Sequence, residues 1–359
     1  MCVYCASANE RENQHMKKRL IGLTLQECEA FAEEIGDRKY RGRQLYKWIY
    51  AKRADSFAAM TDLPAALRDT LSEIAELGYL DVEDVDDRST SDSVKYLFRL
   101  QDGRHIESVY IPDSSRKTLC ISSQVGCGLN CQFCATAQLG LQRQLTAGEI
   151  IGQVLTSMRL RGHDLTNIVF MGMGEPFANY DEVIRAAQLL SDDNGLAIGA
   201  RRIVLSTAGL VDKIIRYADE GHKFRLAISL NSPFQEQRGQ LMPISRKWDV
   251  TALLEAVKYY AVKSHKVPTL EYVLLAGVND SREHAAGLKK IVQSMPCKIN
   301  LIPYNPTGAL FSRPSAQHIE TFIRWLLPLR AGLSVRWSKG DDAQAACGQL
   351  AGKKEERLL

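Results

Sequence analysis

Hydrophobic positions near the start of the chain recur with the period of an α-helix. Leu25–Ile35 and Arg41–Arg53 each combine an apolar face with a charged one, and Pro64–Leu77 predicts a third helix with proline in its first turn. In the second segment, one face carries Leu45, Trp48 and Ile49, and the opposite face carries Arg43 and Lys47. The acidic run Asp81–Asp87 is interpreted as the connection to the rest of the chain.

The pattern then changes to short apolar runs of β type. Val94–Leu100 and His105–Ile111 predict a β-hairpin around Asp102 and Gly103. Further strands are predicted at Leu119–Ser122, Asn167–Met171, Arg202–Ser206, Arg225–Ser229, Thr269–Leu275, Lys298–Ile302 and Leu333–Trp337. Amphipathic helices are predicted between them at Ala147–Met158, Val211–Ala218, Val250–Lys263 and Ala316–Leu326.

Strands that alternate with helices indicate parallel βα units. We therefore expect an α/β fold with an open or partial (β/α)6 barrel, extended by the β-hairpin. Residues 1–92 would form a small helical domain and residues 93–359 the core. In such folds the chemistry gathers at the carboxyl ends of the strands.

Charge adds one observation to this picture. The 359 residues include 46 Lys and Arg against 42 Asp and Glu, a net charge of +4 that permits a nucleic-acid partner without requiring one. Cationic residues are concentrated before the hairpin: Lys17, Lys18, Arg19, Arg38, Lys39, Arg41, Arg43, Lys47, Lys52 and Arg53. They form either a solvated helical face or an RNA-binding surface.

The chain has no apolar segment of the kind that makes a signal peptide or a membrane span, so we expect a cytoplasmic protein without a membrane partner. Its nine cysteines are odd in number and irregularly spaced. In a protein of this size they favour reduced thiols or metal ligands over a disulfide framework.

The densest chemical signal is CGLNCQFC, which directly follows the first core strand. Cys127, Cys131 and Cys134 can converge on one soft metal centre. A structural zinc site would need four protein ligands, usually in paired CxxC spacings. Three thiolates instead suit a [4Fe-4S] cluster with one iron left open to a small molecule.

CxxxCxxC resembles the radical S-adenosylmethionine (SAM) superfamily, and four further segments narrow the resemblance. TLCISSQVGCGLNCQFCATAQLGLQRQLTAGEIIGQV, MGMGEPFANYD, NLIPYNP and GDDAQAACGQLAGK are together similar to the RlmN/Cfr family of RNA adenosine methyltransferases. The similarity runs from about Leu20 to Lys354. GDD ahead of AACGQL is more similar to members that methylate carbon 2 than to those that methylate carbon 8.

The resemblance implies a radical SAM barrel, a [4Fe-4S] cluster, SAM as cofactor and an RNA-binding helical domain. It implies methylation of carbon 2 of adenosine 2503 in 23S rRNA and of adenosine 37 in tRNAs, with carbon 8 methylation as the alternative. An electron donor such as flavodoxin or ferredoxin would reduce the cluster. We expect a monomer.

A cofactor pocket is predicted where MGMGEP follows the apolar run NIVFM. Gly174 allows close backbone approach there, and the Glu175 carboxylate could receive an ammonium group, although an ordinary glycine turn would look the same. By resemblance these two residues bind SAM, together with Ser206, Ser229, Leu230, Asn231 and Asn305. Related sequences usually carry His where this chain has Asn231, and an amide can donate a similar hydrogen bond.

Three more residues acquire roles through the resemblance. Cys347 matches the cysteine that is methylated on sulfur, and Cys120 matches the one that forms a transient disulfide with it; without the resemblance, each could be a buried thiol. Glu107 matches the proton acceptor. Strand alternation places it on the inward face with Val109 and Ile111, where a buried salt bridge is the other interpretation.

The remaining cysteines carry less information. Cys2 and Cys5 form a CxxC near the amino terminus that does not predict a second metal site. Cys28 and Cys297 are interpreted as packing residues.

Overall fold

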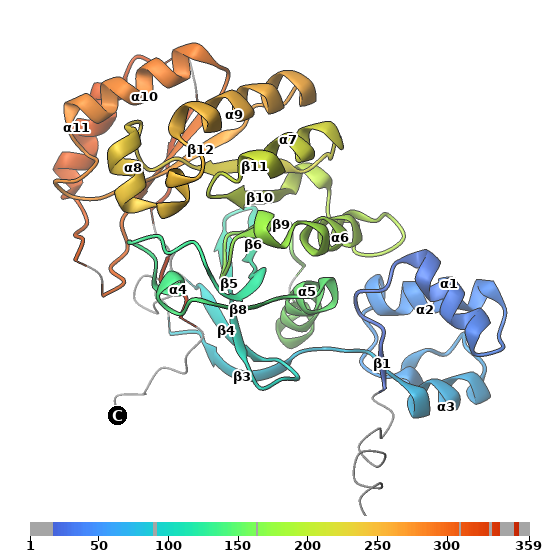
Figure 1. Ribbon diagram of the computed structural model, residues 1–359. Helices are drawn as coiled ribbons and strands as arrows, with labels where there is room; N and C mark the ends of the chain where they lie inside the picture. Colours follow the sequence, from blue (N-terminus) through green and yellow to red (C-terminus); the bar gives the residue numbers. More distant parts are fainter. Residues whose placement is uncertain are drawn as a thin grey trace, which may run out of the picture.

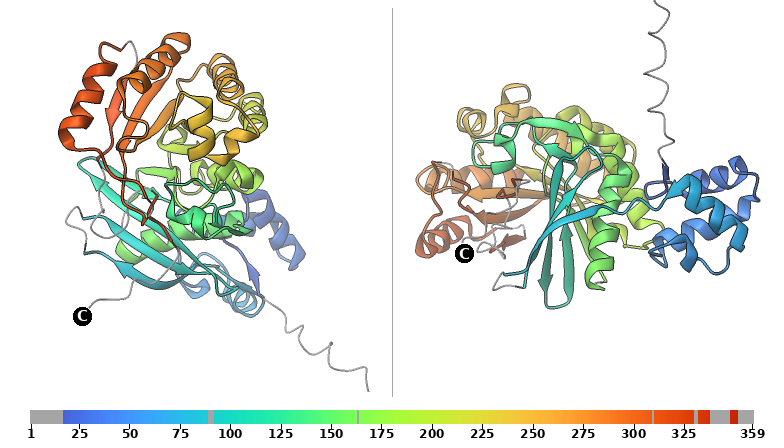
Figure 2. Two further views of the ribbon diagram at one scale, coloured as in Figure 1. Left: turned by 60° about the vertical axis from the view of Figure 1, so that its left-hand side comes forward. Right: turned by 90° about the horizontal axis from the view of Figure 1, so that it is seen from below.

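The computed structural model describes residues 17–88, 92–162, 164–308, 310–329, 332–337 and 348–351. A small helical unit lies to one side of a larger body built around a sheet (Figures 1 and 2). The unit contains α1 (Leu25–Glu34), α2 (Lys39–Tyr50) and α3 (Ala65–Ile74), with the two-residue strands β1 (Lys18–Arg19) and β2 (Ala75–Glu76) paired in parallel. The three predicted helices are confirmed, the third beginning directly after Pro64.

Local sequence explains where the first helix begins and how the unit packs. The Thr24 hydroxyl accepts a hydrogen bond from the Glu27 N–H at 3.2 Å, and the Glu27 carboxylate accepts one from the Thr24 N–H at 2.7 Å. This reciprocal capping box satisfies two amides that the first turn leaves open. In α2, Leu45 and Ile49 are buried while Lys47 is exposed, as the helical pattern predicts.

The larger body is organised on one ten-stranded sheet in the order β14-β13-β12-β11-β10-β9-β6-β5-β4-β3. Its strands are β3 (Asp81–Asp86), β4 (Val94–Arg99), β5 (His105–Asp113), β6 (Arg116–Cys120), β9 (Asn167–Phe170), β10 (Ile203–Thr207), β11 (Arg225–Ser229), β12 (Thr269–Leu274), β13 (Lys298–Pro303) and β14 (Leu333–Val335). Pairing is antiparallel from β3 to β6 and parallel from β6 through β9 to β14. Within the described residues β3 and β14 do not pair, so the barrel is partial, as expected.

Helices connect the parallel strands and cover the sheet on its outer side (Figure 1). They are α5 (Ala147–Arg161), α6 (Tyr180–Ser191), α7 (Val211–Asp219), α8 (Gln235–Leu241), α9 (Val250–Ser264), α10 (Arg282–Ser294) and α11 (Ala316–Leu326). Their apolar faces and the sheet form one continuous core. Among the described residues, no helix is long and apolar enough to cross a membrane.

The interpretation of the acidic run as a connection is wrong, because these residues form the edge strand β3. Val82 and Val85 pack against the core, and a register shift between Val82 and Asp84 adapts the strand to its neighbour β4. Arg99 pairs with Asp81 at 3.3 Å, and Arg88 pairs with Asp86 at 2.6 Å. Alternating valines and neutralised carboxylates therefore make an edge strand out of a charged segment.

The sequence patterns also missed several elements. Helices α6, α8 and α10 were not predicted, nor was the short antiparallel ribbon of β7 (Gln124–Gly126) and β8 (Leu141–Gln144). Between its strands lies α4 (Ala135–Gln138), a single helical turn. The ribbon matters for function because it carries the cysteine motif.

Candidate active site

The three motif cysteines lie on the loop between β7 and β8. At the base of this loop, Gly126 has a φ of +74°, and a Cβ atom there would lie 1.8 Å from the carbonyl oxygen of Gly140. Only glycine permits this approach. The N–H of Cys127 donates to the same oxygen at 2.9 Å. The loop is therefore closed by backbone contacts immediately before its first cysteine.

Cys127, Cys131 and Cys134 line one pocket at the carboxyl ends of the parallel strands. Burial raises the pKa of the Cys127 thiol to about 12, and raises that of Cys131 well above its ordinary value, with the two neighbouring thiols adding to the effect. Thiolates in this position need a compensating cation, which the irons of a cluster supply. Within the described part of the chain, no group of three His, Cys, Asp or Glu side chains is arranged around a single metal ion. A cluster differs from such an ion because each thiolate binds a different iron.

The pocket wall opposite the cysteines is the loop after β9. Gly174 has a φ of +97°, and a Cβ atom there would lie 2.5 Å from the Cβ of Gln124. The Gln124 side-chain oxygen accepts a hydrogen bond from the Glu175 N–H at 2.7 Å. Gly174 is thus required so that the MGMGEP loop can pack against the strand that leads into the cysteine loop.

Glu175 is a buried carboxylate, 4% exposed. Its oxygens accept hydrogen bonds from the N–H groups of Phe177 at 2.9 Å and Ala208 at 2.7 Å. No cationic side chain of the described residues forms an ion pair with it. Burial raises its pKa to about 7, although the backbone donors favour the ionised form. A buried carboxylate that lacks an ion pair with the described residues is suited to receive a positively charged ligand.

Most of the other predicted cofactor residues border the same pocket: Ser206, Ser229, Asn231 and Asn305. Asn231 has a φ of +57°, a conformation that asparagine tolerates well. Its amide nitrogen donates to the Met242 sulfur at 3.2 Å and its side-chain oxygen accepts from the Val273 N–H at 2.8 Å. Leu230 is not among the lining residues; it is fully buried, and its carbonyl accepts a bond from Arg238.

Two buried charged residues at the site were not predicted from the sequence. Arg238, 1% exposed, donates to the carbonyl oxygens of Ala208 at 2.6 Å, Ser229 at 3.1 Å and Leu230 at 3.0 Å. It therefore ties together the ends of β10 and β11. Glu271 borders the pocket from β12 and accepts a bond from the Asn300 amide at 2.6 Å. Strand alternation with Thr269 and Val273 would have indicated its inward position.

Residues 348–351 lie between the cysteine loop and Glu107. The Gly348 carbonyl accepts from the Ala135 N–H at 2.8 Å, and the Leu350 carbonyl accepts from the Thr136 hydroxyl at 2.6 Å. The Ala351 N–H donates to Glu107 Oε2 at 2.8 Å. The described carboxyl-terminal segment thus links α4 to β5.

Glu107 is 2% exposed, and Lys95 Nζ lies 3.9 Å from its Oε1 atom. The inward position is confirmed, and a buried ion pair is present as well. Cys120 is paired across the strands with Val109, so it lies on the same sheet face as Glu107. Cys347, Cys2 and Cys5 lie outside the described residues. The six described cysteines are all free thiols.

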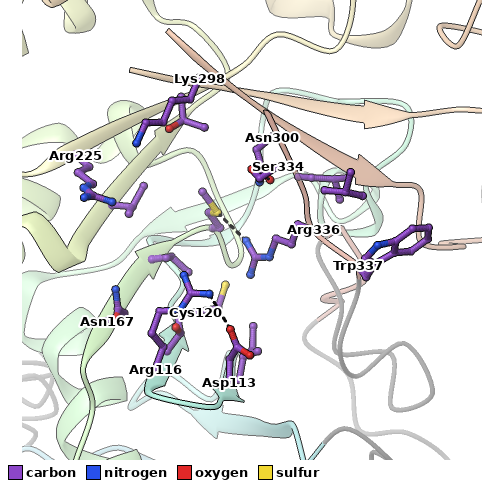
Figure 3. A pocket seen from close by; sticks show the side chains of 18 of the residues that line it. Asp113, Arg116, Cys120, Asn167, Arg225, Lys298, Asn300, Ser334, Arg336 and Trp337 are labelled. Atoms are coloured by element: carbon purple, nitrogen blue, oxygen red, sulfur yellow. Dashed lines mark hydrogen bonds and ion pairs between the residues drawn. The ribbon is translucent and has the colours of Figure 1, made fainter. Parts of the chain in front are cut away.

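A second cavity, of about 740 Å³, adjoins the cofactor pocket. Figure 3 shows side chains that line this second cavity. Met171, Ile302 and Leu350 border both, and Cys120 borders the second. One space therefore continues from the cysteine loop toward the amino ends of the strands. A site of this size can hold a nucleoside-sized group beside the cofactor pocket.

A partial parallel barrel with a three-cysteine loop and a buried carboxylate at its carboxyl end defines a radical SAM protein. Residues 121–288 match the radical SAM superfamily, and residues 18–77 match the ribosomal RNA large subunit methyltransferase N-terminal domain.

Curated relatives and a solved structure narrow the class. A dual-specificity RNA methyltransferase RlmN of Geobacter sulfurreducens is 46% identical, with 92% of this chain and 91% of that protein aligned. The corresponding protein of Alcanivorax borkumensis is 42% identical over 95% of this chain and 92% of that protein. A crystal structure of a radical SAM methyltransferase from Sphaerobacter thermophilus is 42% identical, with a TM-score of 0.89 over 94% of this chain and 100% of that one. This chain belongs to the RlmN family of radical SAM methyltransferases.

Proposed function

We propose that this protein methylates carbon 2 of adenosine in RNA, at adenosine 2503 of 23S rRNA and at adenosine 37 of tRNAs, through a methylated Cys347. The names of its relatives support RNA as substrate. The observation that carries the proposal is the anchoring of residues 348–351 between the cysteine loop and Glu107. In the sequence, Cys347 directly precedes this anchored segment.

Cys127, Cys131 and Cys134 would hold the [4Fe-4S] cluster, and Glu175 would receive the ammonium group of SAM. Ser206, Ser229, Leu230, Asn231 and Asn305 would complete the SAM site, Leu230 through its backbone because its side chain is buried elsewhere. When bound, cluster and SAM supply a one-electron cleavage that generates a hydrogen-abstracting radical. The protein would hold both ligands in this pocket.

Radical chemistry fits the substrate because carbon 2 of adenine is electrophilic and carries no acidic proton. A carbon radical derived from the methyl group on Cys347 can add there, whereas attack by the ring on a methyl sulfonium cannot occur. The ring carbon must then lose its proton, for which Glu107 is the proposed acceptor, and the adduct must give up one electron, which would return to the oxidised cluster. Lys95, 3.9 Å away, would balance the charge of the ionised carboxylate.

Product release needs a second sulfur because the methylene group still joins Cys347 to the base. Cys120 borders the cavity and is 8% exposed, so its thiolate could attack the Cys347 sulfur in line. A disulfide forms, the carbon–sulfur bond breaks with its electron pair on the methylene carbon, that carbon takes up a proton, and the methylated base leaves. A later reductant restores the two thiols.

The remaining parts of the chain have proposed roles as well. Residues 1–92 would contribute to RNA binding through the exposed cations of α2. A small one-electron donor such as flavodoxin or ferredoxin would reduce the cluster. We propose that the protein is cytoplasmic, since the RNA substrates and the reduced thiols both belong to the cytoplasm. We also propose that it is a monomer.

The proposed mechanism can be tested with two cysteine variants under anaerobic conditions. Cys120→Ala should trap a protein–RNA adduct that survives denaturation, because nothing then attacks the crosslink. Cys347→Ala should give no adduct, since the methyl carrier is absent. Normal turnover by Cys120→Ala, or an adduct in Cys347→Ala, would defeat the mechanism.

A further inference from the structure

The cavity beside the cofactor pocket opens at the amino ends of the parallel strands. Its lining includes the first residue of five strands: Arg116 of β6, Asn167 of β9, Arg225 of β11, Thr269 of β12 and Lys298 of β13. The cofactor pocket lies at the opposite ends of the same strands. The space inside the barrel therefore has a second mouth, remote from the cysteine loop.

This mouth is cationic. Arg116, Arg225, Lys298 and Arg336 line the cavity, whereas Asp113 is the one carboxylate among the lining residues that the structure describes (Figure 3). Asp113 pairs with Arg116 at 2.8 Å. Arg225 and Lys298 are exposed, and no carboxylate in the described part of the chain pairs with either. Two uncompensated cations at a cavity mouth favour an anionic ligand.

The positive charge extends along the same edge of the sheet. Arg201, Lys223 and Lys266 precede β10, β11 and β12. The pKa of Lys266 is lowered, chiefly by burial and then by repulsion from Arg201 and Lys223, so both of these cations lie near Lys266. A row of cations across successive strand starts matches the spaced phosphates of a nucleic-acid strand better than a single small anion.

The mouth leads to the reacting groups. Along β13, Lys298 lies at the mouth and Ile302 at the border with the cofactor pocket, four residues or about 13 Å further on. Cys120 lies on the wall of the same cavity. A base that enters here would reach Cys120 without crossing the cysteine loop.

We propose that RNA docks across the amino ends of the barrel strands, with Arg225 and Lys298 binding phosphates beside the target nucleotide. The target adenosine is unstacked into the cavity from this end, opposite to the cofactor pocket. This inference rests on the proposed function and adds the surface and the direction of substrate entry.

The test uses the full chain and an unmodified 23S rRNA fragment that contains adenosine 2503. Binding is measured at several salt concentrations for wild type and Arg225→Gln/Lys298→Gln. Each phosphate contact on single-stranded RNA contributes about 0.7 to the logarithmic salt slope, so the slope should fall by about 1.4. Affinity near 0.1 M salt should fall about 25-fold, since each lost contact is worth roughly fivefold there.

Lys258→Gln/Lys290→Gln is the matched control, because it removes the same charge from exposed positions on α9 and α10. It should retain wild-type affinity and salt slope. Arg225→Lys keeps the charge and should bind RNA almost as wild type does. In turnover assays, the Gln pair should raise KM for RNA while kcat at saturating RNA and SAM affinity stay near wild type.

The possible outcomes separate this inference from the proposed function. If wild type neither binds nor methylates RNA, the proposed function fails. If wild type is active but the Gln pair matches the control pair in affinity and slope, the docking surface is wrong while the function stands. A loss of kcat with unchanged RNA affinity would likewise overturn the phosphate-binding role.

Discussion

Replacing Glu175 by glutamine should stabilise the protein without its cofactors and weaken SAM binding at the same time. The carboxylate is buried, is bonded only to neutral donors, and has no cationic partner among the described residues. Glutamine resembles its protonated form and carries no charge to bury. It also cannot pair with an ammonium group.

The size of the effect follows from the pKa of Glu175, which burial raises from 4.5 to about 7. Because the folded-state pKa lies above the unfolded one, this group stabilises the fold below about pH 4.5, and the contribution is lost as the pH rises through about 7. Between about pH 5.5 and about pH 8, the free energy of unfolding of wild type should fall by roughly 2 kcal/mol because this carboxyl group ionises. Glu175→Gln should not lose it.

The assay is urea unfolding of cofactor-free protein across this pH range, comparing wild type with Glu175→Gln. Glu255→Gln, on the exposed face of α9, is the control and should follow wild type. The SAM affinity of Glu175→Gln should fall about 30-fold or more. This fall corresponds to a loss of about 2 kcal/mol of binding free energy, the least that is expected when a buried charge pair loses one partner. Parallel pH profiles for wild type and Glu175→Gln, or unchanged SAM affinity, would refute this reasoning.

Three further predictions concern the cluster, the pocket wall and the helical unit. Cys131→Ala should abolish iron incorporation and visible absorbance after anaerobic reconstitution, whereas Cys297→Ala, at a buried thiol remote from the loop motif, should retain both. Arg238→Met should lower the free energy of unfolding by about 3 kcal/mol or more, because three buried carbonyl oxygens lose their donor; a loss below 1 kcal/mol, roughly one ordinary hydrogen bond, would contradict that role. Arg43→Ala/Lys47→Ala should weaken RNA binding and reduce its salt slope by about 1.4, and an unchanged slope would remove α2 from the RNA surface.

Regular periodicity explains why much of the sheet could be predicted from the sequence. The bounds of β11 and α11 match the predictions Arg225–Ser229 and Ala316–Leu326. A buried parallel strand is recognised by its apolar run, and a helix that covers the sheet is recognised by its amphipathic pattern. Strand β3 was missed for the opposite reason. Its carboxylates hid the two valines that bury one side of the strand.

Some residues of the site could be predicted and others could not. Motifs describe residues that are neighbours in the sequence, whereas several contacts of the site join residues that are far apart in the sequence. The cysteine loop and Glu175 follow from short motifs. The bond from Ala351 to Glu107 joins residues 244 positions apart, and no local pattern encodes it. Arg238 was missed since its role is to hold three backbone carbonyls, which no side-chain pattern records.

The central claim is that the methyl carbon reaches adenosine carbon 2 through methylated Cys347 by a radical step. The direct measurement is anaerobic turnover with SAM that carries a trideuterated methyl group, followed by mass spectrometry of the RNA nucleosides. The account predicts 2-methyladenosine whose methyl group keeps two deuterium atoms, with the third in 5′-deoxyadenosine, because one hydrogen is abstracted before the carbon joins the base. A product methylated at carbon 8, or a methyl group that retains all three deuterium atoms, would contradict it.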